Sequence, residues 1–398
     1  MNREQIVKNL KAKIKVSGHI IGTVAGSGMT ARFTSLGGAD LFLALSAGKF
    51  RLMGRGSYMS YFCYCNSNDM VMNFGTQELL PLLDDKPIFF GLNASDPTIS
   101  LYDYIRKIKE SGFAGIVNFP TICLIDGQFG EALEEEGNTY DAEVEAIRFA
   151  HYLDMLTIAF VTTEEEAGKM VDAGADIICA HLGLTKGGYT GAKKYLSLEA
   201  ACNLSSRIFK LCEDKRPDII KMVYGGPLVT PEDVRYVFSK TSCEGYIGGS
   251  TFDRIPIEQV LLDTTASFKS YGTQDTDLIG KLFNGSLDRK DQVKFAQSYI
   301  EEHYMLPDLY LADIALFLGV SGSYLSTKFK RETGVSFTEY LVRFRMNKAR
   351  ELLRGPYSTL REVAERVGYT DYVQFSKMFK KYVGVTPSDF AKDNINTK

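Results

Sequence analysis

Eight short apolar runs, spread over the first 250 residues, constrain the fold more than any other feature. They lie at residues 19–24, 40–45, 87–92, 115–119, 156–161, 176–180, 219–224 and 245–247. Each run is almost continuously apolar, as is typical of strands that are covered on both faces. Helical stretches separate them, and two of these begin with the capping patterns Thr163-Glu-Glu-Glu166 and Thr230-Pro-Glu-Asp233. Eight strand–helix units predict an α/β fold, a closed (β/α)8 barrel of TIM type, with an open doubly wound sheet as the alternative.

Charge and cysteine content divide the chain into two parts. Of its 398 residues, the last 114 (285–398) carry 18 Lys and Arg against 14 Asp and Glu, whereas the first 284 carry 28 against 35. A basic last part on an acidic body predicts a polyanionic partner for the last part alone. All seven cysteines lie in the body without a zinc-binding spacing, so we expect reduced thiols, a cytoplasmic protein and no metal ligands among them. The charged start and the lack of long apolar runs predict neither a signal peptide nor a membrane span.

Functional groups of such barrels lie at the carboxyl ends of the strands and in the loops that follow. Glycines gather there after the first, seventh and eighth predicted strands. Glycine loops let backbone N–H groups approach an anion closely, although tight turns alone would also require them. The predicted ligand-binding residues in these loops are Ser27, Gly28, Gly225, Gly226, Gly249 and Ser250.

Three polar residues at other strand ends are candidates for chemistry. Asn118 follows the fourth strand, Asp126 lies in the loop beyond it, and His181 follows the sixth strand. We expect Asn118 and His181 to contact the ligand as well. In a catalytic barrel Asn118 would orient the substrate, Asp126 would act as a base or bind a divalent cation, and His181 would act as an acid. No cofactor is otherwise indicated.

The body also resembles a known family. The resemblance is carried in order by Gly26-Ser-Gly28, Gly37-Gly-Ala-Asp40, Gly54-Arg-Gly-Ser57, Asn118-Phe-Pro-Thr121, Leu124-Ile-Asp-Gly127, Ala180-His-Leu-Gly183, Gly225-Gly-Pro227 and Gly248-Gly-Ser250. Over about residues 8–269 the chain is similar to the phosphoenolpyruvate-hydrolase-like TIM-barrel family. The resemblance implies a phosphorylated three-carbon acid as ligand. Tyr224 stands where the family tends to have His, which disfavours turnover more than binding.

An internal duplication marks the last part of the chain. The segment Asp313–Gly319 aligns with Glu362–Gly368 at an offset of 49, and Phe329 aligns with Phe379 at an offset of 50. Each copy has the pattern of a helix, a glycine-containing turn and a second helix. This is a helix-turn-helix unit, whose second helix can enter the major groove of DNA. We therefore divide the chain into a barrel (1–272), a linker (273–288) and a double helix-turn-helix domain (289–398).

The duplicated segment resembles the AraC/XylS-type DNA-binding domain over residues 294–392. The matching motifs include Leu311-Ala-Asp-Ile-Ala315, Gly334-Val-Ser-Phe337, Val367-Gly-Tyr369, Phe375-Ser-Lys-Met-Phe379 and Gly384-Val-Thr-Pro387. The resemblance implies that a helix over about 337–353 joins the two units. Recognition helices at about 322–331 and 372–381 would then enter successive major grooves.

Exposed side chains of these two helices are the predicted DNA contacts. Gln, Lys, Thr and Val can read base edges, whereas further lysines and arginines contact phosphates without reading sequence. The predicted base-reading residues are Ser323, Ser326, Thr327, Tyr372, Val373, Gln374 and Lys377. The predicted phosphate-binding residues are Lys328, Lys330, Arg331, Lys380 and Lys381.

Together these features predict a transcription regulator that responds to a ligand. The barrel would bind a small anionic, phosphorylated or carboxylated effector, and the C-terminal domain would bind double-stranded DNA as part of a homodimer. The alternative is a metabolic enzyme, a hydrolase or lyase of a phosphoenolpyruvate-like acid, that carries a DNA-binding tail. A third reading is an inert barrel used only for dimerisation.

Overall fold

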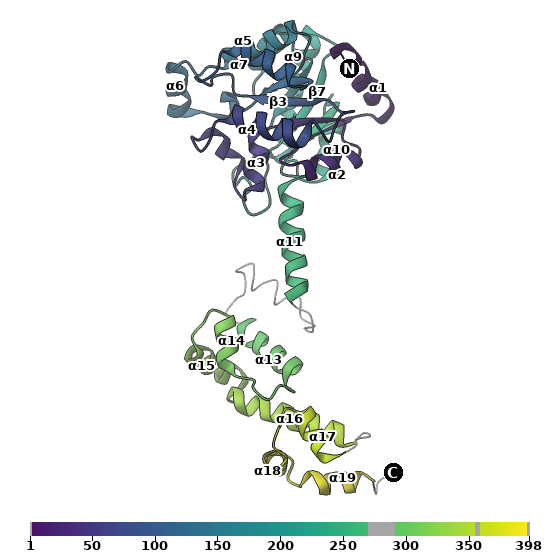
Figure 1. Ribbon diagram of the computed structural model, residues 1–398, viewed down its shortest axis with the longest axis vertical. Helices are drawn as coiled ribbons and strands as arrows, with labels where there is room; N and C mark the ends of the chain where they lie inside the picture. The colour runs from purple at the N-terminus through teal and green to yellow at the C-terminus, as the bar shows by residue number, and fades with distance from the viewer. Residues whose placement is uncertain (1, 270–290, 355–358, 396–398) are drawn as a thin grey trace. The chain divides into compact units, whose positions relative to one another are not determined.

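The computed structural model describes residues 2–269, 291–354 and 359–395, and the predicted linker at 273–288 lies outside them. The chain divides into two compact units, residues 1–259 and 260–398 (Figure 1). The division falls within helix α11 (Arg254–Lys269). None of the helices in the described segments is long and apolar enough to cross a membrane.

The first unit is a closed parallel barrel. Its eight strands pair in chain order, and β8 pairs back onto β1 with Ile20 opposite Gly245. The closure confirms the predicted barrel and excludes the open sheet. The strands are β1 (Ile20–Val24), β2 (Leu41–Ala44), β3 (Ile88–Leu92), β4 (Gly115–Asn118), β5 (Leu156–Val161), β6 (Ile177–His181), β7 (Ile220–Tyr224) and β8 (Gly245–Gly248). Every strand residue is buried except Ile21, which is partly covered, and this explains the nearly continuous apolar runs.

Helices surround the strands, and their starts follow the capping patterns of the sequence. They are α1 (Arg3–Ser17), α2 (Gly28–Leu36), α3 (Ser46–Leu52), α4 (Ser67–Phe74), α5 (Leu101–Glu110), α6 (Gly127–Glu135), α7 (Tyr140–Tyr152), α8 (Glu164–Asp172), α9 (Leu198–Lys215) and α10 (Pro231–Lys240). Short turns of helix lie at η1 (Ser57–Tyr61), η2 (Gly75–Leu79) and η3 (Ile122–Leu124). Both predicted capping boxes form, Thr163 with Glu166 and Thr230 with Asp233.

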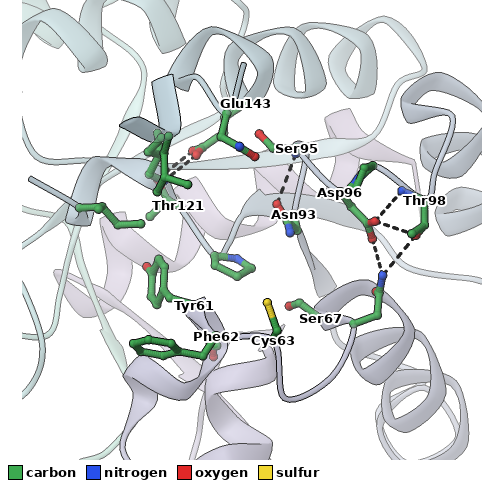
Figure 2. Close-up of a pocket in the computed structure, with 18 of the residues that line it drawn as sticks. Tyr61, Phe62, Cys63, Ser67, Asn93, Ser95, Asp96, Thr98, Thr121 and Glu143 are labelled. Carbon is green, nitrogen blue, oxygen red and sulfur yellow. Dashed lines mark hydrogen bonds between the residues drawn. The ribbon is translucent and has the colours of Figure 1, made fainter. Parts of the chain in front are cut away.

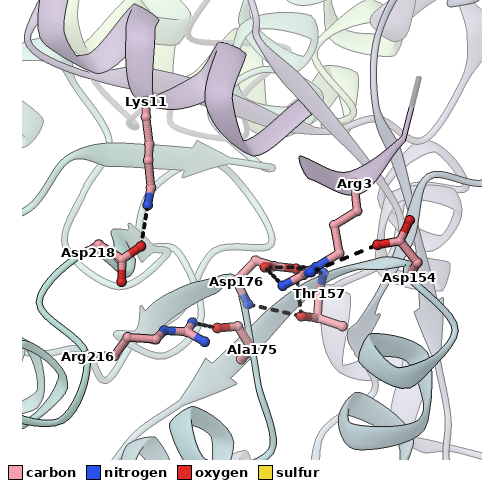
Figure 3. A network of polar contacts seen from close by, with 8 residues as sticks. All are labelled: Arg3, Lys11, Asp154, Thr157, Ala175, Asp176, Arg216 and Asp218. Carbon is pink, nitrogen blue, oxygen red and sulfur yellow. Dashed lines mark hydrogen bonds and ion pairs between the residues drawn. The ribbon is translucent and has the colours of Figure 1, made fainter. Parts of the chain in front are cut away.

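Helix α1 is tied to the amino-terminal end of the barrel. Its Ile6 and Leu10 pack in the same buried cluster as the inward-facing strand residues. Arg3 forms an ion pair with Asp176, with Nη2 and Oδ1 2.7 Å apart, and Asp176 also accepts hydrogen bonds from the backbone and side chain of Thr157 (Figure 3). The opposite, carboxyl-terminal end of the barrel is thereby left for the loops that follow the strands.

A buried ion pair joins loops at that carboxyl-terminal end. Arg51 of α3 donates to the carbonyl of Val24, at the end of β1, and pairs with Asp253, beyond β8, at 2.8 Å. The two charged side chains are 1% and 0% exposed. Arg51 therefore links the first, second and eighth strand–helix units around the point where the sheet closes on itself.

The second unit contains two helix-turn-helix units that share one long helix. Its helices are α13 (Asp291–His303), α14 (Leu311–Phe317), α15 (Gly322–Thr333), α16 (Phe337–Arg354), α17 (Leu360–Arg366), α18 (Tyr372–Val383) and α19 (Pro387–Ile395). Two separate cores form, one around α14 and α15 and the other around α17 and α18. Helix α16 contributes Phe337 and Leu341 to the first core and Met346, Ala349 and Leu353 to the second.

The duplication seen in the sequence is also present in the packing. Ile314 and Phe329 are buried in the first core where Val363 and Phe379 are buried in the second. Helices α15 and α18 both end at a glycine in the left-handed conformation, Gly334 at φ 80° and Gly384 at φ 95°.

Breaking the Arg51–Asp253 pair should destabilise the barrel strongly. Removing one partner leaves the other charge buried and unpaired, and such changes cost about 3–5 kcal/mol. Arg51→Met and Asp253→Asn should each lower the free energy of unfolding by this amount in urea titrations. The control is Arg106→Ala, because Arg106 pairs with Asp103 on the exposed surface of α5 and such pairs contribute at most about 1 kcal/mol. Equal losses from the buried and exposed changes would contradict this role.

Candidate functional site

The face of each recognition helix opposite its core is exposed. Leu325 and Phe329 of α15, and Phe375 and Phe379 of α18, point into the two cores. Around them, the predicted base-reading side chains lie outside the cores. Ser323, Ser326, Thr327, Val373, Gln374 and Lys377 are exposed, and Tyr372 is half-buried.

Polar caps fix where both recognition helices begin. Ser321 accepts a hydrogen bond from the backbone N–H of Tyr324 at 3.2 Å. Asp371 accepts one from the backbone N–H of Val373 at 2.7 Å. Helix N-termini are favoured positions for contacts with phosphate, and they place the first-turn side chains where a groove-binding helix presents them.

Four of the five predicted phosphate-binding side chains are exposed, as a contact with DNA requires, and one is buried. Lys330, Arg331, Lys380 and Lys381 are exposed in the last turns of α15 and α18. Lys328 is instead buried: its Nζ donates to Gln292 at 3.0 Å and lies 5.6 Å from the centre of the Tyr324 ring. The prediction for Lys328 is therefore wrong in this conformation, because the side chain ties α15 to α13.

Arg345 holds separate segments of the second unit together, a role that the sequence did not indicate. From the middle of α16 it donates to the carbonyls of Tyr304 and Leu306 at 2.7 and 2.6 Å. Its guanidinium also lies 5.5 Å from the centre of the Tyr369 ring, next to the turn before α18. Arg345 thus connects the end of α13 with the turn of the second helix-turn-helix.

A cavity of about 600 Å³ opens at the carboxyl-terminal end of the barrel, beside strands β2 to β4 (Figure 2). Three loop segments and the α6–α7 region enclose it. The lining residues are Ser60, Tyr61, Phe62, Cys63, Cys65, Asn66, Ser67, Asn93, Ser95, Asp96, Pro97, Thr98, Pro120, Thr121, Ile122, Ile125, Leu133, Asn138 and Glu143. The volume lies within the usual range for sites of small organic ligands.

Asn118 lies behind this cavity. Its Nδ2 donates to Glu143 at 2.6 Å and to the carbonyl of Phe160 at 3.1 Å, and its Oδ1 accepts from the N–H of Phe160 at 2.7 Å. These bonds join β4 to β5 and hold the Glu143 carboxylate. Asn118 therefore positions a cavity residue, a different place from the direct ligand contact expected from the sequence.

Glu143 is the most chemically distinctive group of the cavity, and the sequence reasoning did not single it out. It also accepts hydrogen bonds from the hydroxyl of Thr121 and the N–H of Ile122, both at 2.8 Å. Burial raises the pKa of this carboxyl to about 7, although the hydrogen bonds from Asn118, Ile122 and Thr121 oppose the shift. The group therefore changes its charge near neutral pH.

His181 is placed as a packing residue. Its ring is buried against Phe160 and Tyr224, and its Nδ1 accepts from the N–H of Gly183 at 3.2 Å. Burial lowers the pKa of His181 to about 3, so the ring is neutral at physiological pH. It does not line the cavity, and a neutral imidazole is a poor proton donor for the acid role expected of it.

The structure does not bring the remaining predicted barrel residues into the cavity. Asp126 is exposed at the start of α6. Ser27 and Gly28 line a separate hollow formed by α2 and η2, and the N–H of Gly28 already donates to Glu78.

The glycine pairs after β7 and β8 are tightly packed against neighbouring groups. A Cβ on Gly225 or Gly226 would collide with the backbone of the loop after β6. One on Gly249 would lie within 3.2 Å of the Tyr224 hydroxyl and the Arg51 guanidinium, and Ser250 is buried beside it. Close packing therefore accounts for these glycines without an anion.

Comparison with known proteins fits this architecture. Residues 5–271 match the family described as phosphoenolpyruvate hydrolase-like. The chain belongs to this family. Residues 314–393 match a helix-turn-helix domain, and this second domain is of the AraC type.

Three relatives illustrate the two parts. The chain is 39% identical over 272 residues to the "Putative transcriptional regulatory protein y4pA" of Sinorhizobium fredii, which covers 68% of this chain and 44% of the relative. It is 37% identical over 269 residues to the "ToMV resistance protein Tm-1(GCR237)" of Solanum lycopersicum, and the match covers 67% of this chain and 36% of the relative. Over 84 residues it is 40% identical to the "Msm operon regulatory protein" of Streptococcus mutans, and the match covers 21% of this chain and 30% of the relative. The chain thus spans less than half the length of each of these relatives.

Glu143 should make the stability of the barrel depend on pH. The pKa of about 7 in the folded state exceeds the value of about 4.3 in an unfolded chain, so the folded state holds this proton more tightly. The free energy of unfolding should therefore fall by about 3 kcal/mol as the pH rises from 4 to 7. The contribution of Glu143 should level off above the folded-state pKa, once the carboxyl is ionised in both states. Glu143→Gln should flatten this slope in urea titrations at several pH values.

The matched control for this measurement is Glu135→Gln, because Glu135 is exposed at the end of α6. An unchanged pH slope in Glu143→Gln, or an equal flattening in both variants, would show that Glu143 does not carry this effect.

Proposed function

We propose that the protein is a sequence-specific DNA-binding transcription regulator of the AraC type. The observation that carries the proposal is the duplicated pair of capped recognition helices on the shared helix α16, each with its polar side chains exposed. The similarity of this part of the chain to a protein named as an operon regulator supports the same function. Arg345 and the two cores hold both recognition helices in place within the second unit.

In this proposal the two groups of exposed side chains have different roles. Gln374 and Lys377 of α18, with Ser326 and Thr327 of α15, contact base edges in successive major grooves. Lys330, Arg331, Lys380 and Lys381 contact phosphates.

Two lysines of α18 should separate these roles. Sites are first selected from random duplexes with the full-length protein, and binding is then measured by gel shift at several salt concentrations. Lys377→Ala should reduce the discrimination between the preferred and the other base pairs at one position of the site, by about 1–3 kcal/mol. Lys381→Ala should weaken binding to all duplexes alike and lower the slope of log affinity against log salt by about one.

Lys210→Ala serves as the control, because Lys210 is an exposed lysine of α9 in the barrel unit. Identical loss of selectivity in Lys377→Ala and Lys381→Ala would refute the assignment. A wild-type protein with no preference for any duplex over bulk competitor would refute the proposed function.

We also propose that the barrel binds a small effector in the cavity beside β2 to β4. A bound ligand changes DNA binding only if it has different affinity for two arrangements of the protein, and couplings of about 1–3 kcal/mol are typical. The cavity's volume and its polar lining residues, among them Asn93, Asp96 and Glu143, support this role. The chemistry of these groups also bears on the class of effector.

We further propose a homodimer that uses α11. Val260, Leu261 and Phe268 of this helix are large apolar side chains that are 60%, 60% and 83% exposed. Packing against a second copy would remove them from water. Sedimentation velocity should show a dimer that Leu261→Lys converts to monomer, whereas the exposed control Lys210→Ala should not. A wild-type monomer at micromolar concentration, or a dimer unaffected by Leu261→Lys, would contradict the proposal.

A further inference from the structure

Two residues with buried carboxylates line the cavity without a cation to balance them. Asp96 is 6% exposed and Glu143 is 4% exposed, and both line the cavity. Neither forms an ion pair within the described segments. Buried carboxylates in folded proteins are normally paired with a cation or a metal, because an isolated buried charge is costly.

Asp96 is held as an anion by four donors. Its Oδ1 accepts from the N–H and hydroxyl of Thr98 at 2.9 and 2.6 Å, and its Oδ2 accepts from the side-chain amides of Asn66 and Asn68 at 2.7 and 2.9 Å. Burial alone would raise the pKa of Asp96, but these hydrogen bonds outweigh it and leave the pKa below its usual value. Asp96 therefore gives this part of the cavity a negative charge at neutral pH.

Glu143, also labelled in Figure 2, retains capacity for a further partner. Its Oε2 accepts from Asn118 and Thr121, whereas its Oε1 accepts only from the N–H of Ile122. A carboxylate has about four acceptor positions, so one on Oε1 is free for a donor. The hydroxyl of Ser60, a lining residue that is 9% exposed, also has no partner within the described segments.

The remaining lining residues supply no positive charge. Among the described residues that enclose the cavity there is no lysine, arginine or histidine. Tyr61 and Phe62 contribute aromatic rings, whose faces attract cations. The described residues also hold no group of three or more His, Cys, Asp and Glu side chains able to bind a metal ion. The cavity is therefore acidic, partly aromatic and much larger than a bare ion requires.

We propose that this cavity binds an organic cation, a small amine whose ammonium group lies between Asp96 and Glu143 and donates a hydrogen bond to Glu143. The inference rests on the proposed effector role of the barrel and names the class of effector. It replaces the anionic effector expected from the sequence, because an anion would enter a cavity that holds like charge and no compensating cation. The ligand would supply the counter-charge that the fold leaves out.

The charge of the cavity can be measured before any ligand is known. Cys63 and Cys65 line it and are exposed, whereas Cys123 is partly covered and the other four cysteines are buried. Cationic and anionic methanethiosulfonate reagents (trimethylammonium-ethyl and sulfonato-ethyl) are applied to the full-length protein, and modification of each thiol is followed by peptide mass spectrometry. Each rate is divided by the reagent's rate with free mercaptoethanol.

The cationic reagent should modify Cys63 at least about fivefold faster than the anionic one, as expected for one or two nearby negative charges at an intermediate dielectric. Glu143→Gln should reduce this ratio above pH 7, where Glu143 is charged. Glu135→Gln, the exposed control on α6, should leave it unchanged. A wild-type ratio of one or less overturns the proposal. This outcome is measured on the wild-type protein, so it does not depend on whether a variant folds.

Binding is tested with three ligands of equal chain length: diaminobutane, butanediol and succinate, with phosphoenolpyruvate as a fourth. Each is measured for its ability to slow modification of Cys63 by uncharged iodoacetamide in the presence of EDTA. Diaminobutane should protect best, and Glu143→Gln should weaken this protection about tenfold. Better or equal protection by succinate, phosphoenolpyruvate or butanediol overturns the proposal, as does protection that appears only when Mg²⁺ replaces EDTA.

If none of the four compounds protects Cys63, the ratio of its modification rates by the cationic and anionic reagents decides alone whether the cavity favours a cation. The gel-shift measurements are independent of both thiol experiments. Loss of selective DNA binding would refute the proposed regulator while leaving the charge of the cavity as measured, and a neutral or positive cavity would refute the cationic ligand while leaving the DNA reader intact.

Discussion

Closure of the barrel between β8 and β1 is the constraint on which the rest of the first unit depends. The backbone pairing brings the loops after β1, β2 and β8 together, and Arg51 then has two partners within reach: the carbonyl of Val24 at the end of β1 and the carboxylate of Asp253. A charge this deeply buried is tolerable only when its partners are fixed, so the pair stabilises the closed sheet and also requires it. Open strands would leave both charges without compensation.

The pairing of neighbouring strands assembles the cavity. Its walls come from segments spread over about 80 residues of the chain, at Ser60–Ser67, Asn93–Thr98, Thr121–Ile125 and Glu143. Parallel pairing of β2 with β3 and of β3 with β4 places the loops after these strands side by side. The polar bonds from Asn118 to Phe160 and Glu143 extend the strand ladder into the site, so the position of the carboxylate follows from the pairing of β4 with β5.

Much of the fold could be predicted because its signals are local. Continuous apolar runs mark buried strands, and capping patterns mark helix starts, so the strand positions agree within about a residue. The resemblance to the AraC/XylS-type domain likewise implied the positions of α15, α16 and α18. The cavity could not be predicted in this way, because no local pattern relates residue 96 to residue 143. One signal was available: Glu143 lies at helical spacing among Tyr140, Val144 and Ile147, which are all buried.

Lys328 is a second residue whose position is not predicted by its residue type alone. Its charge predicts a phosphate contact, yet it lies three residues after Leu325 and one before Phe329, on the face of α15 that enters the core. Helical spacing would have placed it correctly.

The sharing of α16 between two cores has a geometric consequence for how such a protein can change over evolution. Phe337 and Leu341 belong to one core, and Met346, Ala349 and Leu353 belong to the other. Insertion of a single residue between these sets would rotate the second core by about 100° around the helix axis and advance it by about 1.5 Å. The second helix-turn-helix would then point in a different direction relative to the first, so this stretch of helix can vary in composition far more freely than in length.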